Sequence, residues 1–163
     1  MAKTLKTGLV LKIAAYGITF ALVIGLFRWT HSDRAKIGRL FREVAALLEK
    51  DGPEPVFEMS LKANKLRDYF AAECRLDIPQ YDVRTTFLRD DVAGSVLVQR
   101  SGLDKLRLAF SDLETVVEGS HARVAGRVTL QTSNAAYDLN ECMFDVMLVN
   151  DGRWRIVSIR GVK

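Results

Sequence analysis

Residues 105–130 read KLRLAFSDLETVVEGSHARVAGRVTL, and the alternation in this stretch decides the fold. Apolar and polar residues take turns along it, which is typical of β-strands that bury one face. The inward-facing positions from Leu106 to Phe110 share one parity, whereas those from Leu113 to Val117 have the other. A β-bulge near Ser111–Asp112 explains the change, and bulges bend sheets. We therefore expect two long strands in a curved sheet.

The strand pattern continues to the C-terminus. Residues 142–148 alternate again, and Asn150-Asp151-Gly152 is a strong signal for a tight turn between two antiparallel strands. Trp154 to Ile159 forms the last predicted strand.

Three helices are predicted before this region. The first spans Thr30 to Lys50 with one apolar stripe, the second begins near Ser60 and runs to Phe70, and the third spans Asp90 or Asp91 to Ser101. Residues 74–78 and 83–87 alternate as a strand pair between the second and third helices. Helices followed by a run of strands predict an α+β fold, with about three helices on one face of a curved antiparallel sheet.

This order of elements resembles the nuclear transport factor 2-like superfamily, which includes SnoaL-like proteins and ketosteroid isomerase. The residues that carry the resemblance are Asp68–Cys74, running into Leu76–Pro79, and the terminal Asp151–Ile156. The resemblance covers residues 33–163. It implies a cone-shaped domain whose sheet and helices enclose a pocket, with a small apolar ligand as one possible occupant.

An apolar segment precedes the predicted domain. Residues 13–27, IAAYGITFALVIGLF, carry no charge, and residues 8–27 reach the length of a membrane-spanning helix if Lys12 extends its ammonium group to the interface. A cleavable signal peptide is the alternative, but residues 28–31 offer no small-residue cleavage site. We expect a transmembrane signal-anchor in residues 1–30 and one domain in residues 31–163.

The flanking charges leave the orientation of this anchor open. Counting Lys and Arg on the two sides slightly favours a cytoplasmic domain, whereas a short N-terminal head commonly stays inside while the remainder is exported. We expect a single-pass protein of a bacterial inner membrane with its domain on the periplasmic side. Gly17, Ala21 and Gly25 form a small-residue stripe that suits a second helix, from a homodimer or a membrane-protein partner.

The net charge of +4 comes entirely from the predicted anchor. Residues 1–30 hold four of the 24 basic residues and none of the 20 acidic ones, so the domain is neutral. A nucleic-acid-binding domain would show a basic face of its own, and we expect no such partner.

The cysteines and the motifs give no sign of a cofactor or metal. Cys74 and Cys142 are far apart in sequence and lack the spacing of zinc ligands. They are expected to be two buried thiols, with a disulfide as the alternative. The sequence contains no phosphate loop and no dinucleotide-binding glycine motif, so no cofactor is expected.

Three residues are candidates for catalysis in a pocket of the kind that the resemblance implies. They are Asp112 at the presumed bulge, Asp77 and Tyr81. A buried carboxylate could act as a general base or acid, although capping or hydrogen bonding in a turn is the commoner role for an aspartate such as Asp112. The isomerase pattern would also place a tyrosine in the first helix of the domain, yet Tyr16 lies in the apolar segment.

Other polar residues are expected to be structural. His121 follows the Gly119-Ser120 turn and has the parity of an exposed residue. Glu141 and Asp145 share a parity on one strand and are expected to form a cross-strand charge pair with Arg155.

These observations favour a membrane-tethered, non-catalytic binding or assembly domain. It would receive a ligand or a protein partner in the cone pocket or on an exposed sheet face that carries Met143, Met147 and Val149. The layout is similar to that of inner-membrane assembly factors of type IV secretion machines. The alternative is a small-molecule lyase or isomerase in which a pocket carboxylate is the general base.

Overall fold

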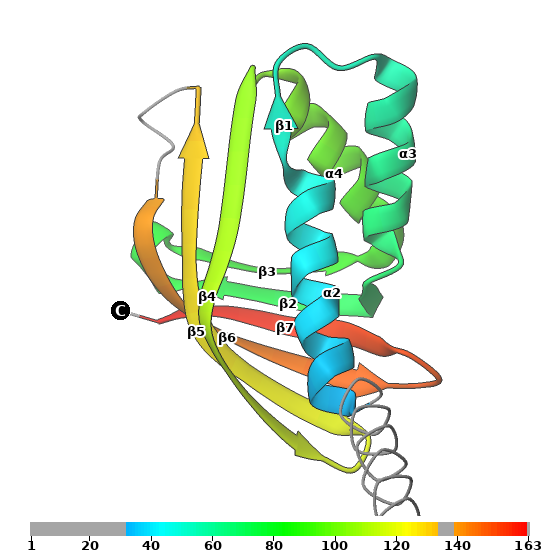
Figure 1. The fold of residues 1–163 in the computed structure, drawn as a ribbon, viewed down its shortest axis with the longest axis vertical. Coiled ribbons are helices and arrows are strands. Elements are labelled where there is room, and N and C mark those ends of the chain that lie inside the picture. The colour runs from blue at the N-terminus through cyan, green and yellow to red at the C-terminus, as the bar shows by residue number, and fades with distance from the viewer. Residues whose placement is uncertain (1–31, 134–138, 163) are drawn as a thin grey trace, which may run out of the picture. The chain divides into compact units, whose positions relative to one another are not determined.

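The computed structural model describes residues 32–133 and 139–162, and it divides the chain into two compact units, residues 1–36 and 37–163. The first described helix begins in the first unit with one turn, residues 33–36. The rest of this helix and all the other described elements, which Figure 1 shows, belong to the second unit. Three helices are present among these residues: α2 (Asp33–Leu48), α3 (Val56–Arg67) and α4 (Arg89–Ser101). The strands are β1 (Lys50–Asp51), β2 (Phe70–Ile78), β3 (Val83–Leu88), β4 (Lys105–Glu118), β5 (His121–Thr132), β6 (Leu139–Asn150) and β7 (Trp154–Val162).

The strands form one curved sheet in the order β1-β4-β5-β6-β7-β2-β3. Most neighbours are antiparallel, as predicted, but β2 pairs with β7 in parallel, so the expectation of a wholly antiparallel sheet is wrong at that junction. In Figure 1 the helices gather on one side of the sheet, which curls around them. The prediction of an α+β fold with three helices and a curved sheet is confirmed.

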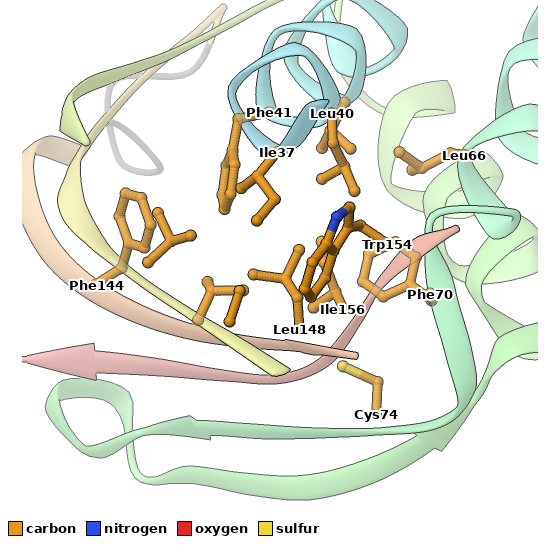
Figure 2. Close-up of a cluster of buried hydrophobic side chains, with 14 of the residues drawn as sticks. Ile37, Leu40, Phe41, Leu66, Phe70, Cys74, Phe144, Leu148, Trp154 and Ile156 are labelled. Carbon is orange, nitrogen blue, oxygen red and sulfur yellow. The ribbon is translucent and has the colours of Figure 1, made fainter. Parts of the chain in front are cut away.

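The core lies between α2 and the inner face of the sheet (Figure 2). Every third or fourth residue of α2 is apolar, and its buried stripe packs on alternate residues of β5, β6 and β7. Three aromatic rings from three elements, Phe41, Phe110 and Phe144, pack on one another with centroids 5.1–5.8 Å apart. These rings occupy space between α2 and the sheet, where the resemblance had implied a pocket.

The predicted bulge in β4 is confirmed. The β4–β5 register shifts between Ser111 and Glu114, and Asp112 adopts a left-handed backbone with φ 53°. The extra residue turns the side chains that follow, so Leu113 and Val117 pack on the core as Phe110 does. The change of parity in the sequence was therefore a correct indication of local structure.

The second helix differs from its prediction at both ends. It begins at Val56, after Pro55 with φ −58°, rather than near Ser60, and it ends at Arg67 rather than at Phe70. The backbone N–H of Ile156 donates a 2.8 Å hydrogen bond to the carbonyl of Tyr69, and Phe70 pairs with Ile156. Pairing with β7 thus replaces the last helical turn, and the sequence pattern gave no hint of this distant partner.

The predicted anchor in residues 1–30 lies outside the described residues. In the part of the chain that the structure does describe, each helix is too short or too polar to span a bilayer.

The two thiols do not form the alternative disulfide. Cys74 and Cys142 are both free; the first is buried and the second half-buried.

Candidate functional site

A row of alternating charge crosses four strands on the outer face of the sheet. Strand alternation buries Cys74 and turns Asp77 to the opposite face. Direct cross-strand pairing then places Asp145 (β6) beside Arg160 (β7), Arg160 beside Asp77 (β2), and Asp77 beside Arg84 (β3). The row is a consequence of register, because each charge faces one of opposite sign on the neighbouring strand.

This face is hollowed into a cavity of about 720 Å³. Its two half-buried carboxylates, Asp77 and Asp145, have side chains only 19% and 15% exposed, whereas the side chains of Arg160 and Arg123 are about two-thirds exposed. The carboxylates therefore lie deep and the guanidinium groups toward solvent. The cavity is lined by Glu73, Arg75, Asp77, Thr86, Arg123, Asp145, Met147, Val157, Ser158, Ile159 and Arg160.

Asp145 is held by Arg123 of β5. The Nε of Arg123 lies 2.9 Å from both carboxylate oxygens, and its Nη2 lies 2.5 Å from Oδ2. The hydrogen bond and the charge of Asp145 raise the pKa of Arg123. Three charge-assisted contacts from one guanidinium thus occupy both oxygens of this carboxylate.

Asp77 is held more loosely. Arg84 Nε lies 3.5 Å from its Oδ1 and Arg160 Nε lies 3.7 Å from its Oδ2. The Oδ1 atom is buried and accepts no hydrogen bond from any described residue. Asp77 therefore keeps an acceptor with unused capacity in the cavity wall.

The next row across the same strands is largely uncharged. It runs from Met147 through Ser158 and Arg75 to Thr86, each directly opposite the next. Arg75 thus stands between two hydroxyl-bearing side chains, and all four residues line the cavity.

The structure places two of the three predicted catalytic candidates, Asp77 and Asp112, at different sites. Asp77 lines the cavity, whereas Asp112 lies at the β4 bulge with a side chain 69% exposed, paired with Arg127 at 3.2 Å. Asp112 is not part of the cavity wall. Tyr81 ends the short 3₁₀ turn η1 (Pro79–Tyr81), and its side chain lies outside the described part of the structure.

The remaining polar predictions are resolved in detail. His121 is exposed, with Nδ1 3.3 Å from the hydroxyl of Ser120. Asp145 and Glu141 both form cross-strand pairs as expected, but the predicted partner is wrong. Their partners are Arg123 and Arg127 of β5, while Arg155 pairs with Asp151 in the β6–β7 turn. The sequence pattern gave the parity of these acids but not which neighbouring strand supplies the cation.

A metal centre is not evident in the described residues, where no group of three or more His, Cys, Asp or Glu side chains could hold an ion.

The fold has many relatives among solved structures. An NTF2-like protein with a cystatin-like fold from Novosphingobium aromaticivorans superposes with a TM-score of 0.61 at 14% identity, covering 87% of this chain and 86% of that one. An NTF2-like protein from Cytophaga hutchinsonii gives 0.58 at 13% identity, covering 80% and 98%. A protein from Catenulispora acidiphila in complex with S-DNPA gives 0.55 at 15% identity, covering 78% and 92%.

These comparisons establish the fold class. The described domain has the NTF2-like, cystatin-like fold, as the resemblance in the sequence implied. No protein-family profile matches the chain, and no curated protein matches it by sequence. Structural similarity at identities of 13–15% supports the assignment of the fold but not of an activity.

Proposed function

We propose that this protein is a membrane-tethered, non-catalytic binding domain that receives a ligand or a protein partner on the outer face of its sheet. The observation that carries the proposal is the cavity of about 720 Å³ whose wall combines charged and apolar side chains. Its volume falls within the range of about 300–1,000 Å³ that small-molecule sites occupy. A similarly folded protein from Catenulispora acidiphila is in complex with S-DNPA, which supports ligand binding by this fold.

The state of the cavity acids favours binding over catalysis. A general base has to be free to take a proton from its substrate. Asp145 accepts three hydrogen bonds from Arg123, and Asp77 faces Arg84 and Arg160. Asp145, with both oxygens occupied, thus serves as a charged wall, and Asp77 is the cavity acid that keeps a free acceptor.

The tether in this proposal is the apolar stretch of residues 8–27, inserted as one helix in a bacterial inner membrane with the domain on the periplasmic side. A C-terminal alkaline phosphatase fusion to the full chain would be active in that orientation. An inactive fusion alongside an active cytoplasmic reporter would reverse the orientation.

A second copy of the chain or another membrane protein is the proposed macromolecular occupant of the same face. Four large apolar side chains on it are between 39% and 53% exposed, which is the kind of surface that partners cover. These residues are Val116, Met143, Met147 and Val162.

Site-directed photo-crosslinking in cells tests the proposal. A photoreactive amino acid in place of Met147 lies in the cavity wall, whereas the same residue in place of Val98 lies on α4 with the original side chain 74% exposed. We expect an adduct at position 147 and none at 98, and its mass separates a small ligand, a dimer and a foreign protein. Equal labelling at both positions, or none at 147, would contradict the proposal.

A second candidate function, a small-molecule lyase or isomerase, has one observation in its favour. Asp77 lines the cavity with a buried oxygen that accepts no hydrogen bond from the described residues, so it is the best-placed general base. An isomerase would incorporate solvent deuterium next to the carbonyl of small test ketones, and Asp77→Asn would abolish the incorporation. Absence of exchange with the unaltered protein would remove this alternative.

A further inference from the structure

Arg75 is the cavity arginine with free binding capacity. Arg123 is engaged by Asp145, and Arg160 lies 3.7 Å from Asp77. The Arg75 guanidinium, in contrast, has no ion pair or hydrogen bond to another described residue, although it lines the cavity. A guanidinium with open donors binds a carboxylate in a two-pronged geometry.

Two hydroxyls extend this anion subsite. Ser158 of β7 and Thr86 of β3 are the direct cross-strand neighbours of Arg75 on either side. Direct neighbours in a sheet have Cβ atoms about 5 Å apart, so both hydroxyls can donate to the same bound anion. The row offers more donors than a lone surface arginine does.

A plain anion does not fit the charges around this row. Glu73 lies two residues before Arg75 on the same face of β2, about 6.6 Å along the strand, and it also lines the cavity. Its carboxylate has no ion pair or hydrogen bond within the described part of the chain. A ligand that satisfies both groups carries a positive charge next to its negative one.

The rest of the wall provides an apolar surface. Met147 and Val157 line the cavity together with the charged rows. The β6–β7 register shifts between Met147 and Leu148, and this irregularity adds Val157 to the wall. Methionine adapts to irregular apolar groups, so this surface suits a branched hydrocarbon of modest size.

We propose that the cavity binds a free amino acid with an apolar side chain. Its carboxylate contacts Arg75, Ser158 and Thr86, its ammonium group contacts Glu73, and its side chain lies over Met147 and its apolar neighbours. This inference rests on the proposed binding function and names the ligand class for the same cavity.

Three probes with the same branched hydrocarbon group test it on the full chain in detergent micelles. L-leucine carries both charges, 4-methylpentanoate lacks the ammonium group, and 3-methylbutylamine lacks the carboxylate. Methyl NMR signals of Met147 and Val157 report binding, since both residues line the cavity. We expect saturable shifts with leucine and at least ~10-fold weaker binding of each analogue, because each loses a charge-assisted contact.

Paired variants assign the two charges. Arg75→Gln should weaken the binding of leucine by at least ~10-fold. Glu73→Gln should weaken the binding of leucine, because it removes the partner of the ammonium group. It should strengthen the binding of 4-methylpentanoate, because it removes a carboxylate that repels this anion. The control is Arg107→Gln, which alters an exposed arginine of β4 outside the cavity wall and should change neither affinity.

The outcomes separate this inference from the binding function on which it rests. If 4-methylpentanoate binds as tightly as leucine, the ammonium contact is wrong and the cavity is a site for anions. If none of the probes shifts the methyl signals while photo-crosslinking at position 147 yields an adduct, the amino-acid class is wrong and the binding function stands. If both experiments are negative, both proposals fail.

Discussion

Arg100 and Glu54 form a buried ion pair, with Nη2 of Arg100 2.5 Å from Oε2 of Glu54. The same guanidinium donates to the carbonyls of Leu47 and Glu49, at 2.5 and 3.0 Å. These carbonyls lie at the end of α2, where helical partners run out. Arg100 is 1% exposed, so one side chain of α4 joins the end of α2 to the segment that leads into α3.

Replacement of Arg100 should be strongly destabilising. Arg100→Met leaves Oε2 of Glu54 and two helix-end carbonyls without the donor that Arg100 supplies, while Lys62 still contacts Oε1 of Glu54. Breaking a buried pair from one side typically costs about 3–5 kcal/mol. Urea unfolding of the full chain in micelles measures the change, and Arg107→Met on exposed β4 is the matched control. A loss below about 1 kcal/mol for Arg100→Met would contradict the structural role.

The stability of the domain should fall in acid through Glu54. Burial would raise the pKa of Glu54, but the hydrogen bond from Lys62 and the charges of Arg100, Lys62 and Lys50 outweigh it, so the pKa lies below its usual 4.5. Because the folded pKa is the lower one, the stabilisation is present above about pH 4.5 and is lost as the pH falls through the folded value.

Unfolding free energies at pH 7 and pH 3.5 measure this loss. Glu54→Gln should be less stable at pH 7 and should show a smaller decline between the two pH values. An unchanged pH dependence in that variant would assign the acid sensitivity to other carboxylates.

The two cysteines should differ in reactivity. Burial raises the pKa of the Cys74 thiol to about 12, so it carries almost no thiolate at pH 8, whereas Cys142 is half-buried. Ellman's reagent should therefore modify one thiol per native chain and two in denaturant. Cys142→Ser should abolish the native reaction and Cys74→Ser should leave it. Rapid native modification of Cys74 would show that the strand β2 opens.

Local patterns in the sequence were sufficient for much of the sheet and for α2. The parity change around Ser111–Asp112 located the bulge, because each side chain of a strand reports its own face. The periodicity of α2 identified its buried stripe for the same reason. Arg100 could not be found in this way, since a charged residue near a helix end normally indicates exposure.

The cavity could be predicted only in part. Alternation places Glu73, Arg75 and Asp77 on one face of β2, which the sequence shows directly. The parallel pairing of β2 with β7, which brings Arg160 beside Asp77, depends on a contact between residues some 80 positions apart. Periodicity within a segment carries no information on which distant strand becomes its neighbour, and so the charged row was not predicted.

Gly126 should resist replacement because of its place opposite the bulge. It pairs with Phe144, and a Cβ built on it would lie 2.8 Å from Leu113 Cδ2, 3.0 Å from the carbonyl oxygen of Ser111 and 3.1 Å from Phe144 Cζ. The carbonyl belongs to the bulged backbone and cannot move aside without disturbing the β4–β5 register. Gly126→Ala should therefore destabilise the domain by about 1–3 kcal/mol, the usual cost of overpacking, measured by urea unfolding.

Gly94 provides the opposite case in the same chain. It lies within α4, and a Cβ there would have no atom within 4 Å apart from its chain neighbours and the backbone of its own helix. Gly94→Ala should stabilise the domain by about 0.5–1 kcal/mol, because alanine loses less conformational freedom than glycine in a helix. If Gly126→Ala lowers the free energy of unfolding and Gly94→Ala raises it, the loss at Gly126 comes from crowding at the bulge and not from the removal of glycine in general. If Gly126→Ala is neutral, β4 yields at Ser111, and the bulge does not fix the curvature of this part of the sheet.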